Sequence, residues 1–189
     1  MTKIYTKTGD QGETSLFSGH RVSKNDPTID ALGTVDEANC AIGQAIAFLP
    51  PGAPFEEIRK QLVTIQNTLF DLGASLATPR TRAPEQKLKK TRFGNEGVVQ
   101  LEEWIDALDN LLPQLRTFIL PGGHPAGAQL HNARVITRRA ERLIVPIHQH
   151  SDVSESVLTY INRLSDYLFV AARTVNHLAH IPEYQWQSV

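Results

Sequence analysis

The chain has 189 residues, of which 41% are hydrophobic and 21% are charged, as in an ordinary globular domain. The chain contains 19 lysines and arginines and 20 acidic residues. This balance argues against a general nucleic-acid-binding protein, which would carry an excess of basic residues. The single cysteine excludes an internal disulfide, and no apolar run is long enough to cross a membrane. Residues 1–5 lack the apolar run of a signal peptide, so we expect a cytoplasmic protein.

Residues 1–26 differ in composition from the rest of the chain and show no helical period. The stretch from Thr6 to Ser15 is small, polar and rich in glycine, which predicts an ordered loop or a short extended segment. Glycines let backbone N–H groups approach a phosphate, and Lys7 adds positive charge that Lys24 could join. The loop lacks the Walker pattern GxxxxGK[ST], so by itself it is weak support for a nucleotide site.

From Asp26 onward, apolar residues recur at helical spacing, and prolines and glycines divide them into five predicted helices. Asp26 followed by Pro27 is typical of a helix start, and this first helix ends at Pro50. The other four are expected at about 55–77, 96–112, 125–147 and 152–178. The sequence therefore predicts one domain over residues 1–189: an N-terminal loop (1–26), an all-α five-helix bundle (27–180) and a tail (181–189).

The segment from Thr78 to Asn95 interrupts the helical pattern with prolines, a glycine and a basic run of Lys87, Lys89, Lys90 and Arg92. Its composition predicts a mobile surface loop. The charge could form an anion site, but a solvated loop is the simpler interpretation.

The fifth predicted helix is apolar around nearly its whole circumference, which indicates burial on most sides. In a bundle this small we expect that surface to form a subunit interface, and a central helix of a monomer is the alternative. Asn162, Arg163 and Asp166 interrupt the apolar surface. Such polar groups need partners, either across the bundle or in a ligand site.

A row of arginines lies in the middle of the fourth predicted helix. Arg134, Arg138 and Glu141 are spaced at i, i+4 and i+7 and so share one face, and Arg139 and Arg142 lie nearby. These guanidinium groups repel one another unless anions intervene, and their planar fork suits phosphate oxygens. The alternative is a solvated charged face with helical pairs to Glu141.

The connection before this helix, residues 118–123, is apolar and rich in glycine. Phe118 within it could belong to the core or to the wall of a pocket. The sequence contains no HExxH motif and no ExxH pair, so neither a zinc protease nor a carboxylate di-iron bundle is supported, and we expect no metal site built from protein side chains.

Four segments, in order along the chain, together resemble the motifs of one family. They are Lys3–Asp10 with Thr14, Ser15 and Arg21–Lys24; Gly33–Glu37; Leu120–Gly123 with Leu130, His131 and Arg134–Arg142; and Tyr160–Phe169. The family is the PduO-type ATP:cob(I)alamin adenosyltransferases, and the resemblance covers the whole chain. It implies a homotrimer of ferritin-like five-helix bundles with active sites between subunits. The implied reaction transfers the 5′-deoxyadenosyl group of ATP to cobalt of cob(I)alamin, forming adenosylcobalamin and releasing triphosphate.

The resemblance also implies roles for individual residues. The ATP loop would consist of Thr6, Lys7, Thr8, Gly9, Thr14, Ser15 and Lys24. The triphosphate and its Mg²⁺ would be met by Arg138, Arg139, Ala140, Glu141 and Arg142, and the nucleotide also by Asn162. Asp36 and Arg134 would form an ion pair across the subunit boundary, and Phe118 would close off the lower face of the corrin. Arg138 and Phe118 are the two residues expected to act in catalysis.

The chain departs from the family pattern in a few places, among them His124 after Gly122-Gly123, a histidine that is not a fixed family feature. Asn25 stands where an acidic residue is usual, Leu32 where an aromatic residue is common, and Ala38-Asn39-Cys40 where Leu-Asn-Ser is typical. These departures leave the activity expected and the preferred corrinoid open. The implied partners are a corrinoid reductase and an adenosylcobalamin-dependent enzyme. The alternative function is a non-catalytic bundle that binds ATP and corrinoid and acts as a carrier or regulatory module; it would not release triphosphate.

Overall fold

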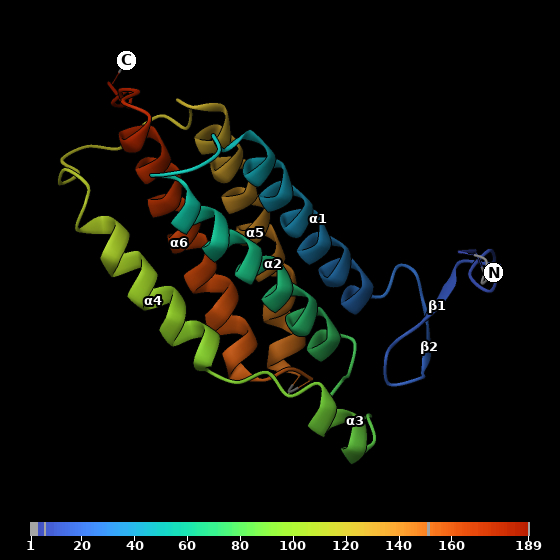
Figure 1. The fold of residues 1–189 in the computed structure, drawn as a ribbon. Coiled ribbons are helices and arrows are strands. Elements are labelled where there is room, and N and C mark those ends of the chain that lie inside the picture. The colour runs from blue at the N-terminus through green and yellow to red at the C-terminus, as the bar shows by residue number, and fades with distance from the viewer. Residues whose placement is uncertain (1–3, 6, 151, 189) are drawn as a thin grey trace.

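The computed structural model describes residues 4–5, 7–150 and 152–188. Its helices and strands, in chain order, are β1 (Glu13–Ser15), β2 (Arg21–Ser23), α1 (Pro27–Phe48), α2 (Glu56–Leu76), α3 (Glu85–Lys90), α4 (Glu96–Asp109), α5 (Pro125–Gln149) and α6 (Glu155–Leu178). The five long helices form the predicted all-α bundle, in which α1 packs against α2 and α5, and α6 packs against α5 and α4 (Figure 1). No helix in the described part of the chain is long and apolar enough to cross a membrane.

The starts of two helices follow from local chemistry that is visible in the sequence. Asp26 accepts a hydrogen bond from the backbone nitrogen of Thr28 at 2.8 Å, and Pro27 occupies the first turn of α1. His124 similarly accepts from the backbone nitrogen of Ala126 at 3.1 Å ahead of Pro125 in α5. These side chains satisfy N–H groups that the helix itself leaves without partners.

The N-terminal segment contains an antiparallel hairpin in which Thr14 of β1 lies opposite Val22 of β2. This agrees with the prediction of an ordered loop or short extended segment. Figure 1 shows the hairpin projecting beyond the first turn of α1, outside the bundle. The prediction of a loop over residues 78–95 was wrong in part, because this segment contains α3. Pro84 fixes the backbone ahead of α3, and Glu85 and Lys89 form an ion pair along it at 2.8 Å.

The basic residue Lys87 of α3 has a structural contact within the chain. Its ammonium donates to the carbonyl oxygen of Phe17 at 2.7 Å and lies 5.5 Å from the centre of the Phe17 ring. At the other side of the segment, Asp152 accepts a hydrogen bond from the backbone nitrogen of Thr81 at 3.2 Å. The segment is therefore fastened both to the hairpin turn and to the α5–α6 connection.

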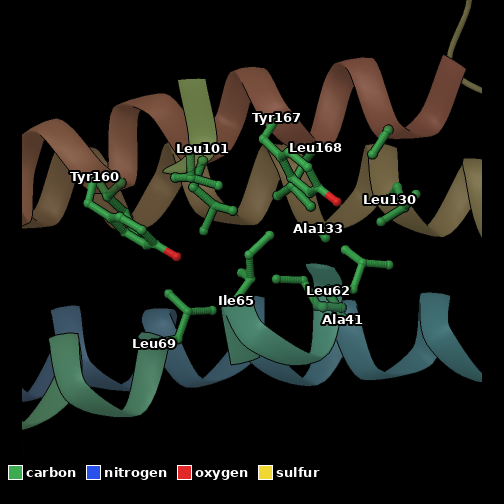
Figure 2. Close-up of a cluster of buried hydrophobic side chains, with 14 of the residues drawn as sticks. Ala41, Leu62, Ile65, Leu69, Leu101, Leu130, Ala133, Tyr160, Tyr167 and Leu168 are labelled. Atoms are coloured by element: carbon green, nitrogen blue, oxygen red, sulfur yellow. The ribbon is translucent and has the colours of Figure 1, made fainter. Parts of the chain in front are cut away.

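Helix α6 is the central helix of the bundle. Ile161, Leu164, Tyr167 and Leu168 are completely buried within a single chain. Figure 2 shows Tyr160 and Tyr167 extending from α6 toward Leu69, Ile65 and Leu62, and the Tyr167 hydroxyl donates to Gln61 at 2.9 Å. The apolar circumference of α6 is therefore covered by α2, α4 and α5 of the same chain, so the apolar surface of this helix does not by itself indicate a subunit interface.

The connection that leads into α5 is fixed by Asn176 of α6. The Asn176 amide donates to the carbonyl oxygen of Gly122 at 3.1 Å and accepts from the backbone nitrogen of His124 at 2.9 Å. Gly123 has a φ of +96°, and a Cβ there would lie 2.3 Å from Oδ1 of Asn176. Only glycine fits this turn, because other residues would be strained and would collide with the amide.

Candidate active site

The arginine row on α5 faces solvent over much of its length. Arg138 and Arg142 are exposed and lie one turn apart, and Arg142 donates to the carbonyl oxygen of Arg138 at 3.2 Å. Arg139 forms an ion pair with Glu37 of α1. In the described part of the chain, neither Arg138 nor Arg142 has an ion pair with a carboxylate. Two uncompensated guanidinium groups at this spacing form a site for an anion.

Two other predicted residues lie beside this row. The amide of Asn162 on α6 donates to Oε1 of Glu141 on α5 at 2.8 Å. This contact fixes the Glu141 carboxylate one turn from Arg138. Arg163 and Asp166 are placed elsewhere: Arg163 pairs with Glu102 of α4 at 2.8 Å and with Asp166 at 3.3 Å. Of these three residues of α6, Asn162 therefore joins the arginine face, whereas Arg163 pairs across to α4 and Asp166 pairs with Arg163 on the same helix.

The glycine-rich loop is folded against the hairpin. The backbone nitrogen of Lys24 donates to the carbonyl oxygen of Gly12 at 2.8 Å, and Arg21 donates to the carbonyl oxygen of Thr8 at 3.0 Å. A Cβ at Gly9 would lie 3.3 Å from Nζ of Lys24 and 3.2 Å from the carbonyl oxygen of Glu13. The loop thus brings its Gly9 backbone and the Lys24 ammonium together.

The remaining residues predicted in this loop lie close by along the chain. Lys7 has a φ of +61°, and its ammonium lies 5.9 Å from the centre of the Tyr5 ring. Thr14 is half-buried and Ser15 is exposed in β1, whereas Thr6 lies outside the described residues. Lys24 also lines a groove that reaches Glu37, the partner of Arg139. Glu37, which the sequence analysis did not assign to the site, therefore lies between Lys24 and the arginine row.

The aromatic side chain of Phe118 lies on the surface, with 82% of its area exposed. Its carbonyl oxygen accepts from the backbone nitrogen of Trp186 at 2.8 Å, and Leu120 donates to the carbonyl oxygen of Tyr184 at 2.8 Å. The tail thus pairs with the connection before α5, an arrangement that the sequence analysis missed. Phe118, Tyr184 and Trp186, all exposed on these two paired segments, are together called the aromatic patch below, and Phe118 lies outside the core.

Asp36 and Arg134 are not paired with each other in the described part of the chain. Asp36 is exposed, whereas Nε of Arg134 is buried and has no hydrogen-bond partner in the described structure. Burial, followed by the charge of Arg138, lowers the pKa of Arg134. The buried Nε is therefore a polar group that the described part of the chain leaves unsatisfied, while the Arg134 side chain as a whole is half-buried.

His131 lies one turn before Arg134 and is 3% exposed. Neither of its ring nitrogens has a hydrogen-bond partner in the described structure, and its ring centre lies 6.0 Å from that of Phe169. Burial, followed by the charge of Arg134, lowers the pKa of His131 from 6.5 to about 4. The imidazole is therefore neutral at pH 7.

The fold and the site together define a helical bundle with an exposed row of arginines on α5 and an exposed aromatic patch. A family profile described as cobalamin adenosyltransferase matches residues 4–175. Corrinoid adenosyltransferase MMAB from Bos taurus is 46% identical over 174 residues, which cover 92% of this chain and 71% of that protein. Corrinoid adenosyltransferase from Bacillus subtilis (strain 168) is 44% identical over 185 residues, which cover 98% and 92%.

Solved structures give the same result. A phenylalanine-to-alanine variant of the PduO-type ATP:corrinoid adenosyltransferase from Lactobacillus reuteri, complexed with cobalamin and ATP, superposes with a TM-score of 0.89 and 39% identity. The match covers 98% of this chain and 100% of that one. An arginine-to-lysine variant complexed with ATP gives a TM-score of 0.87 and 40% identity, covering 97% and 100%. The chain therefore belongs to the cobalamin adenosyltransferase family.

The buried His131 generates a prediction about stability. Between pH 6.5 and about pH 4 the unfolded chain binds a proton at His131 that the folded chain does not, so the free energy of unfolding falls as the pH is lowered through this range. Above pH 6.5 the imidazole is neutral in both states and contributes no pH dependence. Urea unfolding at pH 7.0 and pH 5.0 measures the effect, and His131→Gln should lose less stability than the wild type.

A His177→Gln variant is the matched control, because it changes an exposed histidine and leaves His131 in place. It should keep the pH dependence of the wild type. An imidazole titration of His131 near pH 6.5, followed by NMR in the folded protein, would contradict the prediction.

Proposed function

We propose that this chain transfers the 5′-deoxyadenosyl group of ATP to cobalt of cob(I)alamin, which forms adenosylcobalamin and releases triphosphate. The observation that carries the proposal is the row of Arg138 and Arg142, which pair with no carboxylate among the described residues, beside the Glu141–Asn162 contact. The chain belongs to a family whose relatives are named corrinoid adenosyltransferases, and its structural relatives were solved with ATP and cobalamin. These relatives favour an enzyme over a non-catalytic carrier.

In the proposed reaction the protein positions ATP against cobalt and stabilises the charge that develops on the leaving triphosphate. Cobalt(I) is a strong nucleophile that attacks the 5′-carbon of ATP, and the electron pair of the broken C–O bond leaves with the triphosphate. Arg138, Lys7 and Lys24 stabilise the negative charge that grows on the leaving group. Holding the 5′-carbon in line with cobalt contributes up to ~7–11 kcal/mol through proximity and orientation. No protein residue needs to act as a general base.

We further propose that Mg²⁺ arrives with the nucleotide. Among residues 4–5, 7–150 and 152–188, no three His, Cys, Asp or Glu side chains gather to hold a metal ion. Mg²⁺ is usually bound by phosphate oxygens together with one or two carboxylates, and Glu141 is the carboxylate that Asn162 holds beside the arginine row. When bound, the ion would neutralise charge on the triphosphate.

The Phe118 side chain has a separate role in the proposal. Cobalt(II) is easier to reduce to cobalt(I) after its lower axial ligand has left, and an apolar wall that excludes ligand and water favours that state. The exposed ring of Phe118 supplies such a wall. The cobalt(I) substrate must come from a one-electron reductase, and the product suits an adenosylcobalamin-dependent enzyme.

Arg138→Ala should lower the rate with ATP and chemically reduced cob(I)alamin by ~10²–10³-fold, because it removes one donor to the leaving triphosphate. The assay is run anaerobically and follows both the corrinoid spectrum and triphosphate release, so it also tests the activity of the wild type. Arg82→Ala, a change of an exposed arginine beside Asp152, is the matched control and should keep the wild-type rate. Equal rates for Arg138→Ala and the wild type would overturn this role.

Phe118→Ala should reduce the reaction that starts from cobalt(II) more than the reaction that starts from cobalt(I), because only the former needs the lower ligand removed. The two rates are compared at saturating ATP, together with the absorption and magnetic circular dichroism spectra of bound cobalt(II). Leu115→Ala, on the same connection, is the control and should change neither rate. A four-coordinate cobalt(II) spectrum that persists in Phe118→Ala would argue against the role.

We also propose that the active sites lie between the subunits of a homotrimer. The hairpin projects outside the bundle of its own chain, and the half-buried side chain of Arg134 and the exposed carboxylate of Asp36 have no ion pair in the described structure, which suits a pair between chains. Asp36 also lines a groove with Phe17 and Phe70, which are 50% and 71% exposed and suit contact with another subunit.

A mixing experiment tests this arrangement. Lys24→Ala and Arg138→Ala each remove one half of the site, so subunits of both kinds in one assembly would form some sites with both halves intact. Co-expression with two affinity tags should therefore give mixed assemblies that are more active than either variant alone. Mixed assemblies as inactive as the single variants, or a monomeric mass by light scattering, would contradict sites between subunits.

A further inference from the structure

The guanidinium of Arg173 on α6 is buried, with 3% of the side chain exposed, and has partners in three segments. It donates to the carbonyl oxygen of Pro113 at 2.9 Å and to Oε2 of Glu183 at 3.2 Å, and it lies 4.0 Å from Oδ1 of Asp109. A buried charge is stable only with such partners. One side chain therefore joins the end of α4, the connection before α5 and the tail.

Two of these segments pair with each other a few residues farther along. The Phe118 carbonyl oxygen accepts from the backbone nitrogen of Trp186, and the Tyr184 carbonyl oxygen accepts from Leu120. Residues 114–118 and 184–188 are all exposed, so packing into the core does not hold them in place. The two paired segments follow Pro113 and Glu183 along the chain, and Arg173 donates a hydrogen bond to each of these two residues.

We propose that Arg173 is a positioning residue for Phe118. Its guanidinium fixes the chain before Phe118 and, through Glu183, the tail strand that bonds the Phe118 backbone. The inference rests on the role of Phe118 in the proposed function. Arg173 does not touch the corrin; it acts through the two segments that carry the aromatic patch.

The geometry explains why an arginine is needed at this position. The planar fork directs donors toward Pro113 and Glu183 at the same time, which a lysine ammonium on a flexible stem does not reproduce. Oε1 of Glu183 is buried and has no hydrogen-bond partner in the described structure, so its carboxylate depends on Arg173. Loss of Arg173 leaves the Glu183 carboxylate without its donor, and loss of Glu183 removes the bond between the guanidinium and the tail while the contacts to Pro113 and Asp109 remain. In either case the tail is no longer fastened to α6 at this point.

Glu183→Ala tests the proposal with the full-length protein. It should lower the four-coordinate fraction of bound cobalt(II), and the rate from cobalt(II) by ~10–100-fold, because a misplacement of about 1 Å has that effect on catalysis. The rate from cobalt(I) should change less, and the affinity for ATP, measured by calorimetry, should stay at the wild-type value. Asp109→Ala is the control, since Asp109 faces the same guanidinium and lies outside the tail, and it should leave the spectrum unchanged.

A second pair of variants keeps the test valid if Glu183→Ala fails to fold. Trp186→Pro removes both the indole and the N–H that bonds Phe118, whereas Trp186→Ala removes only the indole. The proline variant should have a lower four-coordinate fraction than the alanine variant.

The outcomes separate this inference from the proposed function. The positioning role of Arg173 would be overturned if Glu183→Ala kept the wild-type four-coordinate fraction and the wild-type rate from cobalt(II). It would also be overturned if Trp186→Pro and Trp186→Ala had equal four-coordinate fractions. In both cases Phe118→Ala could still lose the reaction from cobalt(II), so the proposed function would stand. Wild-type values in Phe118→Ala would overturn both. An inactive wild type in the cobalt(I) assay would contradict the proposed function itself.

Discussion

Repulsion between guanidinium groups on one face of α5 is the constraint on which this site depends. Arg139 is compensated by Glu37, and Glu141 is engaged by Asn162, so the carboxylates nearest to the row are already in use. Arg138 and Arg142 are left exposed one turn apart without an acidic partner in the described structure. An arrangement of this kind is held at a cost in stability until a polyanion enters, and the folded bundle must supply the stability that the row does not.

The bundle meets this requirement by burying the opposite face of the arginine helix. Leu130, Ala133, Ala140 and Ile144 are completely buried against α6 and α1, so the backbone of α5 is held rigidly while its charged side chains remain free. Helix α6 gives this support because it is surrounded by the other long helices. Side chains placed on such helices hold their geometry better than side chains on loops.

The long helices could be predicted because their apolar periodicity and their caps are local signals, as at Asp26 and Pro27. Helix α3 was missed because six residues carry too little periodicity to be recognised. The apolar circumference of α6 was read as a contact between subunits, since a sequence does not show whether such a surface is covered by the same chain. The bridge between 118–120 and 184–186 joins segments distant in sequence, and no short-range pattern marks it.

The same distinction between local signals and contacts of distant segments applies to the site residues. Motif order pointed to Asn162 and Phe118, and the structure places Asn162 beside Glu141 and Phe118 on the surface, whereas their roles remain predictions. Arg173 and Glu183 were not found, although one signal existed: an arginine within the apolar run from Val170 to Val175 must be paired when the helix is buried. The identity of its partner depended on the path of the tail, which only the folded chain reveals.

A single turn of α6 carries both Arg173 and Asn176, and these residues hold the two ends of the connection between α4 and α5. Pro113 is fixed at one end, and Gly122 and His124 at the other. Changes in length or sequence between these anchors can therefore be absorbed locally without displacing the first turn of α5. The exposed connection that carries Phe118 can therefore change among relatives while the arginine helix keeps its register. Under the proposed function, corrinoid selectivity and nucleotide chemistry would then evolve independently within one bundle.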